Sequence, residues 1–439
     1  MNELFEHTSI KKAYFTLAMP VVLSMAVTMI YNMVDTFFVA QTQNANLVAG
    51  VSQGAPLFTM MIALGDIFGL GGSSVISRLF GEKKYKLGRY VSGYCFYSSI
   101  LCGILVTIVM LIFQTPFLHL LGASESTWKY AREYYLVMAW GATFVIFGLT
   151  PTNILRTEGL AVESMIASMT GTIINIFLNP IFIFTCGLGA AGSALATVTS
   201  TVIGDVLMIY YTHYKSKKLT TSIRETKISK KLQLEIYAIG IPASITNLMA
   251  TFATAMTNRY LIAYGATSVA AMGIALKISL ITTMIFVGLA FGAQPLIGYT
   301  YGAKDKKRFW ETIRFDLTVV AGFSICSTIL IMIFAPELIR LFMHDATVIK
   351  EGTIMIRWLS SSATFAGIIL VFTTTFQSMG KAVPAFLLSF CRQGLVFSVV
   401  IMALHPLFGY TGILAAQPVA DLVTLIISLI LFRIYKPKF

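Results

Sequence analysis

One carboxylate, Asp35, stands inside an otherwise apolar stretch near the start of the chain. A charged group in membrane hydrocarbon costs about 3 kcal/mol, so it usually faces a polar cavity and marks an ion pathway. Thr28, Asn32 and Asp35 are spaced i, i+4, i+7, which predicts that they share one face of a helix. Pro20, fifteen residues before Asp35, can kink this helix. We therefore expect Asp35 to exchange a cation from a polar helix face.

Two further polar stripes lie in apolar segments later in the chain. Their members recur every third or fourth residue, and they are Ser168, Thr172, Asn175 and Asn179 in one segment, and Ser193, Thr197 and Thr201 in the next. Amide and hydroxyl oxygens suit a hard cation. Either stripe alone could equally hold neighbouring helices together. Combined with Asp35, the stripes predict one polar pocket.

Four other acids lie in or near apolar segments and are weaker candidates for the ion pathway. They are Asp66, Asp205, Asp316 and Asp421. Arg259, Lys277 and Arg392 lie within or near the edges of such segments. We expect some of these acids and bases to pair with one another, because unpaired charges in hydrocarbon are costly.

No set of residues for covalent chemistry is found. The five histidines form no HExxH pattern, and no GxxxxGK[ST] phosphate-binding loop is present. The five cysteines form no CxxC pair and lie in apolar runs, so we expect them to be small buried residues without disulfides. The sequence thus predicts a protein that is not an enzyme, hydrolyses no ATP and holds no resident cofactor.

The elements that must position these residues are membrane helices. Of 439 residues, 56% are hydrophobic and only 12% are charged, about half the charged share of a soluble domain. A bilayer core requires about 20 apolar residues of helix, and twelve such runs occur along the chain. These numbers exclude a cytosolic enzyme, a disordered chain and a nucleic-acid-binding domain.

The basic residues predict the orientation of the chain in the membrane. The net charge is +13, and we place 24 of the 32 Lys and Arg residues on one side of the bilayer and four on the other. Cytoplasmic loops carry the basic excess in membrane proteins. We therefore expect a multi-pass protein of the inner (plasma) membrane with both termini and the basic segment 215–231 in the cytoplasm. This segment is expected to be a solvated linker.

The two halves of the chain resemble each other at a nearly constant offset of 221 residues. Leu17–Pro20 aligns with Ile239–Pro242, and Leu79–Lys83 aligns with Thr300–Lys304. Each half has six expected spans, so both halves run the same way through the membrane. Transporters built from such parallel repeats have a pseudo-two-fold axis along the membrane normal.

This repeat defines the predicted architecture. We expect an all-α polytopic membrane protein of twelve transmembrane helices in two six-helix bundles, with lobes 1–212 and 236–439 joined by a cytoplasmic linker loop, 213–235. Thr257 stands where the second half would repeat Asp35, so the ion site is expected in the first half alone.

The motifs of the sequence resemble those of the multidrug and toxic compound extrusion (MATE) family, and the resemblance covers nearly the whole chain. It rests on Asn32-x-x-Asp35-Thr36, the glycine-rich run 68–74, Leu155–Gly159, Asn175-x-x-x-Asn179-Pro180 and Gln294–Lys304. The resemblance implies export of cationic, lipophilic compounds in exchange for Na⁺ or H⁺. The expected partners are therefore small cationic drugs or toxins and the lipid bilayer, with no nucleic acid, and we expect a monomer.

The resemblance also implies the site residues. In prokaryotic relatives with a first-half cation site, the motif positions fall on Asp35, Asn175, Asn179 and Thr197, which become metal ligands only if Na⁺ is the coupling ion. Where those relatives carry an Asp-Pro pair, this chain has Asn179-Pro180, so Asp35 is the only carboxylate of the set. The choice between Na⁺ and H⁺ stays open. Asn32, Gln53 and Thr172 are assigned to substrate binding.

The predicted function is secondary active multidrug efflux by cation antiport through alternating access. One alternative is a flippase for lipid-linked precursors from the same superfamily, in which Arg259, Lys277 and Arg392 would bind phosphates. A second is a membrane-embedded enzyme or channel. Efflux of a cationic dye driven by an ion gradient distinguishes the three.

Overall fold

The computed structural model describes residues 3–437, which are 88% helical and contain no strand. Eleven helical segments in this range are long and apolar enough to cross a membrane. The last of them, Ala382–Tyr435, holds 54 residues, about 80 Å of helix and more than twice the hydrocarbon thickness. Its helix is broken at Gly409, which has φ +57°. This segment therefore accounts for two of the twelve predicted spans.

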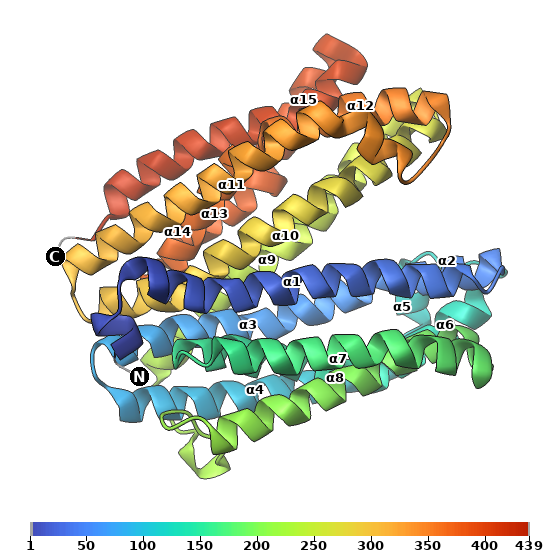
Figure 1. The fold of residues 1–439 in the computed structure, drawn as a ribbon. Coiled ribbons are helices and arrows are strands. Elements are labelled where there is room, and N and C mark those ends of the chain that lie inside the picture. The colour runs from blue at the N-terminus through green and yellow to red at the C-terminus, as the bar shows by residue number, and fades with distance from the viewer. Residues whose placement is uncertain (1–2, 438–439) are drawn as a thin grey trace. The chain divides into compact units, whose positions relative to one another are not determined.

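The chain divides into two compact units, of which the first contains Leu23–Ser244 (Figure 1). The helices that lie wholly or partly in this unit are α1 (Ile10–Ala40), α2 (Ala45–Gln53), α3 (Ala55–Gly81), α4 (Tyr85–Ile112), α5 (Gln114–Leu120), α6 (Trp128–Thr157), α7 (Ala161–Pro180), the π-helical turn η2 (Ile181–Thr185), α8 (Gly189–Tyr214), the short turn η3 (Ile223–Glu225) and the first part of α9 (Lys230–Leu261).

The second unit contains Phe5–Val22 and the residues from Ile245 onward. Its elements are the turn η1 (Glu3–His7), α9 (Lys230–Leu261), η4 (Ile262–Tyr264), α10 (Ala266–Gly302), α11 (Lys306–Arg340), α12 (Ala346–Ser361), α13 (Ala363–Ser378), α14 (Ala382–Phe390), the π-helical turn η5 (Cys391–Leu395) and α15 (Val396–Tyr435).

Two helices contribute residues to both units. Residues of α1 up to Val22 belong to the second unit, and residues of α9 up to Ser244 belong to the first. Pro20 and Pro242, which align in the internal repeat, lie just before these two switch points. A proline inside a helix removes one backbone hydrogen bond and permits a bend. The two compact units therefore differ from the two halves of the sequence. The start of α1 belongs to the second unit, and the start of α9 belongs to the first.

Short side chains set the starts of several helices. Asn44 caps α2 by accepting hydrogen bonds from the backbone N–H groups of Asn46 and Leu47, both at 3.1 Å. Asp305 and Asp345 cap α11 and α12 in the same way. Such caps satisfy backbone donors that have no partner within the helix.

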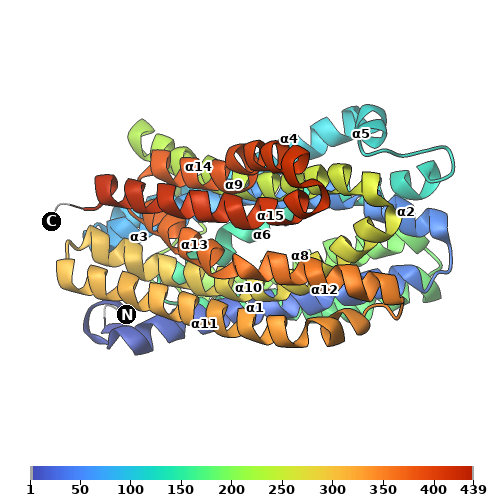
Figure 2. The same ribbon diagram turned by 90° about the horizontal axis from the view of Figure 1, so that it is seen from above.

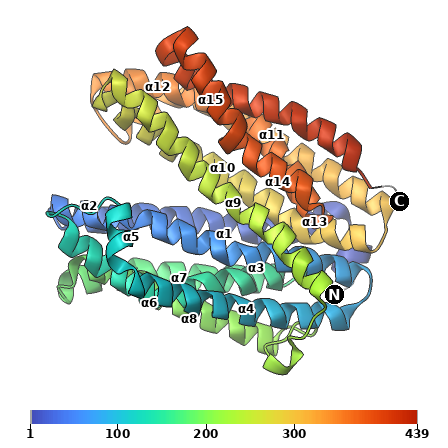
Figure 3. The same ribbon diagram turned by 180° about the vertical axis from the view of Figure 1, so that it is seen from behind.

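Each unit is built around one central helix. In the first, α6 lies beside α3, α4 and α8, and it buries Tyr135, Met138 and Ile146 almost completely (Figure 3). In the second, α10 lies beside α11, α12 and α13, with Phe286 in its buried core (Figure 2). Each central helix therefore packs against at least three neighbours within its own unit.

The basic segment between α8 and α9 is not a free linker. The buried carboxylate of Glu158 accepts hydrogen bonds from the backbone N–H groups of Lys217 at 2.8 Å and Lys218 at 3.1 Å. Further along, Tyr97 donates a hydrogen bond to the carbonyl oxygen of Thr221 at 2.7 Å. The segment is thus held at these points by a buried carboxylate and a tyrosine hydroxyl, while Lys215, Arg224 and Lys227 are exposed.

The cysteines also depart from expectation in part. All five are free, and Cys95 and Cys391 are buried as predicted. Cys186 and Cys326 are exposed, and Cys102 is partly so. An apolar run in a membrane helix can face lipid as well as the protein core, so hydrophobicity alone does not show burial.

Candidate functional site

Asp35 accepts hydrogen bonds from two other helices of the first unit. Its Oδ1 atom receives one from Asn179 Nδ2 of α7 at 2.7 Å and one from Ser193 Oγ of α8 at 3.2 Å. The polar stripe that contains Asp35 is thereby hydrogen-bonded to the stripe that contains Asn179 and to the stripe that contains Ser193. Helices α1, α7 and α8 thus meet at a single carboxylate oxygen.

The hydrogen bonds continue from this carboxylate along the α7–α8 interface. Asn179 Nδ2 also donates to Asn175 Oδ1 at 2.9 Å, and Asn175 Nδ2 donates to Ser200 Oγ at 3.2 Å and Thr197 Oγ1 at 3.4 Å. Asn175 and Asn179 are 2% and 0% exposed. We call Asp35, Asn175, Asn179, Ser193, Thr197 and Ser200, together with Tyr31, the Asp35 cluster.

Tyr31 and Tyr134 approach the cluster from α1 and α6. The hydroxyl of Tyr31 lies 3.2 Å from Thr197 Oγ1, in hydrogen-bond contact. Tyr134 is buried and interacts electrostatically with both Asp35 and Tyr31. Four helices of the first unit therefore place polar groups around one carboxylate.

Local sequence explains why α7 and α8 can hold this cluster. Gly171 of α7 packs so closely on α8 that an added Cβ atom would lie 2.8 Å from the carbonyl oxygen of Ser200. Small residues permit such close helix contacts in membranes. Directly after Asn179 and Pro180, α7 widens into the π-helical turn η2, a feature that is frequent at functional sites.

The donor set of the cluster suits a small cation. Asn179 Oδ1 is buried and accepts no hydrogen bond among the described residues, and Asp35 Oδ2 likewise has no hydrogen-bond partner there. Carboxylate, amide and hydroxyl oxygens are the ligands of hard cations. No group of three or more His, Cys, Asp or Glu side chains occurs within residues 3–437 that could hold a transition metal. The cluster can thus bind Na⁺ or carry a proton on Asp35.

The three residues assigned to substrate binding lie outside this hydrogen-bond network. Asn32 is exposed, and its carbonyl oxygen accepts from Thr36 within α1. Gln53, at the end of α2, donates to the carbonyl oxygen of Gly122 at 2.8 Å. Thr172 donates to the carbonyl oxygen of Ser168 in its own helix. The structure therefore places only Asn32 and Thr172 on the same helices as cluster members.

The polar stripes predicted from the sequence include residues that do not contact the Asp35 cluster. Thr28 and Thr172 each bond only to the preceding turn of their own helices. Sequence reasoning missed Tyr31 and Ser200, although each has a simple signal. Tyr31 is four residues before Asp35, and Ser200 is three residues after Thr197, spacings that share a helix face.

Two of the remaining acids are paired in the second unit. Asp421 forms an ion pair with Arg392 at 3.0 Å and accepts a hydrogen bond from Gln417 at 2.9 Å, which confirms the expected pairing. Asp316 accepts a hydrogen bond from Tyr14 at 2.8 Å. Arg392 is therefore neutralised by a buried carboxylate.

The other two acids lie in the first unit, away from the Asp35 cluster. Asp66 of α3 interacts electrostatically with the buried Arg156 of α6. Asp205 of α8 is 6% exposed and packs against Gly148 of α6. Neither acid shares a hydrogen bond with Asp35.

Comparisons with known proteins match the chain in its internal repeat and in its fold. The family model described as MatE matches the chain twice, at residues 20–181 and 242–403, which reproduces the internal repeat. The multidrug export protein MepA of Staphylococcus haemolyticus is 30% identical over 98% of this chain and 95% of its own length. MepA of Staphylococcus aureus is 27% identical over 99% and 96%. A crystal structure of MATE in complex with MaD3S is 25% identical, with a TM-score of 0.92 over 98% of this chain and 97% of its own.

Proposed function

This chain belongs to the MATE family and is a multidrug efflux transporter, and on that premise we propose that it exports cationic, lipophilic compounds by antiport with Na⁺ or H⁺. The coupling ion binds at the Asp35 cluster. The observation that carries this proposal is the contact between Asp35 and Asn179, in which a buried amide oxygen lies beside a carboxylate and accepts no hydrogen bond among the described residues.

An exchanger needs a site at which the binding of ion and cargo are linked, and linkage is reciprocal. A cation bound at Asp35 neutralises the carboxylate, and it can rearrange the hydrogen bonds that Asn179 and Ser193 make to it. A cationic compound gains from the ionised carboxylate and loses that attraction once the ion binds. Antiport follows if each occupant disfavours the other.

Helix α1 supports a role in conformational coupling. It carries Asp35 in the part that belongs to the first unit, and its residues Phe5–Val22 belong to the second. A change at Asp35 thus acts on a helix that both units share. We propose alternating access by movement of the two repeats, as in other parallel-repeat transporters.

The exposed Asn32 supports a contact with the exported compound, because it lies on α1 one turn from Asp35. Thr172 and Gln53 stay proposals for substrate binding on sequence grounds alone. The flippase alternative has less support, because Arg392 is paired with Asp421 and is not a free cation for a phosphate.

The proposed location is the plasma membrane, with both termini and the segment 213–235 in the cytoplasm. The uneven distribution of basic residues supports this orientation. Lys227 is exposed, so Lys227→Cys in a Cys186→Ser background reports the side of the linker without disturbing a packed residue. An impermeant thiol reagent should fail to label it in intact cells and should label it after permeabilisation. Labelling in intact cells would reverse the orientation.

The function is tested by dye efflux from proteoliposomes under a Na⁺ gradient and, separately, under a pH gradient. Wild type should respond to at least one gradient, and Asp35→Asn should abolish that response while leaving expression and folding intact. Asparagine keeps the size and hydrogen bonds of Asp35 but cannot ionise. Wild-type transport by Asp35→Asn would contradict the proposed site, and the coupling carboxylate would then be sought at Asp66, Asp205 or Asp421.

A further inference from the structure

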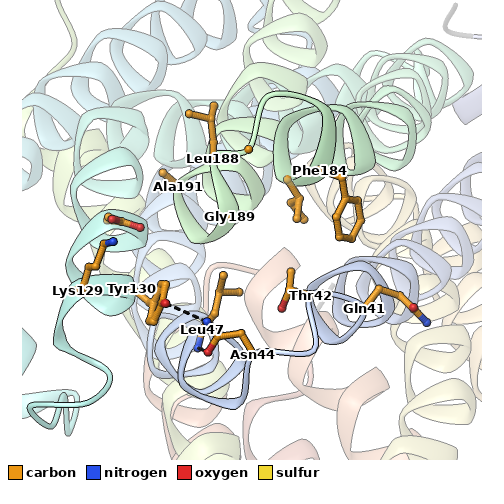
Figure 4. Close-up of a pocket in the computed structure, with 13 residues that line it drawn as sticks. Gln41, Thr42, Asn44, Leu47, Lys129, Tyr130, Phe184, Leu188, Gly189 and Ala191 are labelled. Atoms are coloured by element: carbon orange, nitrogen blue, oxygen red, sulfur yellow. Dashed lines mark hydrogen bonds between the residues drawn. The ribbon is translucent and has the colours of Figure 1, made fainter.

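An open pocket of about 740 Å³ lies at one end of the first unit, where α1 ends and α8 begins (Figure 4). Its walls come from Gln41 and Thr42 after α1, Lys129 and Glu133 on α6, Phe184 in η2, and Ala191 on α8. Asn44 and Tyr130 close one side through a hydrogen bond of 2.9 Å between Asn44 Nδ2 and the Tyr130 hydroxyl. The wall is a mixture of polar and apolar groups.

Several residues of the pocket wall lie close in sequence to residues of the Asp35 cluster or to Tyr134. Gln41 directly follows α1 and lies six residues after Asp35. Phe184 lies five residues after Asn179, and Ala191 lies two residues before Ser193. On α6, Glu133 adjoins Tyr134, which interacts electrostatically with Asp35. The residues of the pocket wall therefore lie within a few positions of the cluster in sequence, and two further wall residues, Leu47 and Ile183, belong to the buried apolar core.

The polar groups of the wall do not form a selective site by themselves. Lys129 and Glu133 contribute one charge of each sign, and no ion pair between them lies within 4.0 Å among the described residues. The helix dipoles at the pocket favour neither cations nor anions. The C-terminal ends of α1 and η2 lie here, which favour cations, and so do the N-terminal ends of α6 and α8, which favour anions. Charge selection must then occur deeper, at the carboxylate of Asp35, whose Oδ2 has no hydrogen-bond partner among the described residues.

We propose that this pocket is a hydrated vestibule through which the coupling cation reaches Asp35 from the side of the membrane opposite the linker. The proposal rests on the proposed function of the Asp35 cluster and adds a route within the first unit. Its occupant is a small hydrated cation. Glu133 raises and Lys129 lowers the local cation concentration, while neither binds the ion in the cluster.

The charges of the wall give the first test. In intact cells or right-side-out vesicles, Glu133→Gln should raise the external concentration of the coupling ion needed for half-maximal efflux by about twofold to fivefold, and Lys129→Gln should lower it by a similar factor. Both shifts should shrink at high ionic strength of a non-coupling salt. The drug concentration for half-maximal efflux should stay unchanged. The proposal would be overturned if both variants shifted the half-maximal ion concentration equally in the same direction. It would also be overturned if only the half-maximal drug concentration changed, because the pocket would then be a drug site.

Plugging the pocket gives the second test. In a Cys186→Ser background, Ala191→Cys should react with an impermeant, positively charged thiol reagent added outside, and the reaction should block ion-driven efflux. Cys186 must be removed because it is exposed beside the pocket residue Gly187. The matched control is Ser126→Cys, which is exposed in the loop before α6 and does not line the pocket. Its modification should leave efflux unchanged.

The outcomes separate the two proposals. If Asp35→Asn transports like wild type, the cluster is not the coupling site, and the vestibule proposal is then rejected as well. If Asp35→Asn is inactive but fully modified Ala191→Cys transports normally, only the vestibule is overturned. Block of Ala191→Cys without block of Ser126→Cys supports the route.

Discussion

Asp35 and Asn179 are separated by 144 residues in the chain, and their side chains meet at 2.7 Å. Asn179 donates a hydrogen bond to the carboxylate of Asp35 through its amide nitrogen. Its amide oxygen, Oδ1, is buried and accepts no hydrogen bond among the described residues. This contact joins the first and fifth spans of the first unit. If the cluster binds the coupling cation as proposed, this contact places a carboxylate oxygen and an amide oxygen side by side for it.

The first prediction concerns that missing carboxylate. Asn179→Asp places a second acid 2.7 Å from the first, and two adjacent carboxylates bind a cation more strongly than one. We expect the variant to keep transport and to need less Na⁺, or a higher pH to release its proton, for half-maximal efflux. Asn179→Leu, which removes both amide atoms, is the matched control and should lose activity. Unchanged ion dependence in Asn179→Asp would show that this position does not contact the ion.

The second prediction is that Tyr31 and Asn32, which are neighbours on α1, differ in their effect on the ion dependence of efflux. Tyr31→Phe removes the hydroxyl that contacts Thr197 at 3.2 Å, and a hydrogen bond of this kind contributes about 1 kcal/mol. Half-maximal efflux should then require about fivefold more coupling ion. Asn32→Ala changes an exposed neighbour and should leave ion dependence unchanged, whatever it does to drug affinity. Efflux titrated against the ion at saturating drug measures both, and an ion effect in Asn32→Ala alone would contradict the assignment.

The third prediction concerns stability in the second unit. Asp421→Asn leaves Arg392 without its buried ionic partner, and such losses cost about 3 kcal/mol. The variant should therefore unfold at a lower temperature in detergent. Glu82→Gln breaks an exposed ion pair with Lys84 and should have little effect. The double variant Arg392→Gln with Asp421→Asn should recover part of the loss. Equal melting temperatures for Asp421→Asn and wild type would show that the pair is not structural.

The fourth prediction is a pH dependence of the segment between α8 and α9, which contains Glu225. Hydrogen bonding from Thr220, then from Arg89 at 2.7 Å, lowers the pKa of Glu225 below its usual value of 4.5. A lowered pKa stabilises the docked segment above pH 4.5, and that contribution is lost as the pH falls through the lowered value. A fluorophore on Lys227→Cys should report loosening only below pH 4.5. The Glu225→Gln variant should be loosened at every pH, and a pH response that survives in it would contradict this origin.

Composition and spacing were enough to predict a large part of this protein. Hydropathy and the offset of 221 residues indicated membrane helices in two repeats, because a bilayer demands long apolar helices and a duplication preserves their order. The polar stripes that contain Asp35, Asn175, Asn179 and Thr197 were predicted for a similar reason, whereas the choice of these four as a cation site came from the family resemblance. Polar groups in an apolar helix stand out, and helical periodicity shows which of them share a face.

Other features depended on contacts that no local pattern encodes. The exposed Cys326 of α11 and the buried Cys95 of α4 both lie in apolar runs, since lipid and protein core select the same residue types. The docking of Lys217 on Glu158, and the passage of α1 from one unit into the other, arise from groups far apart in the chain. Periodicity placed Asn32 and Asp35 on one broad face, but only the packing of α7 and α8 decided that Asp35 and Tyr31 turn inward while Asn32 stays exposed.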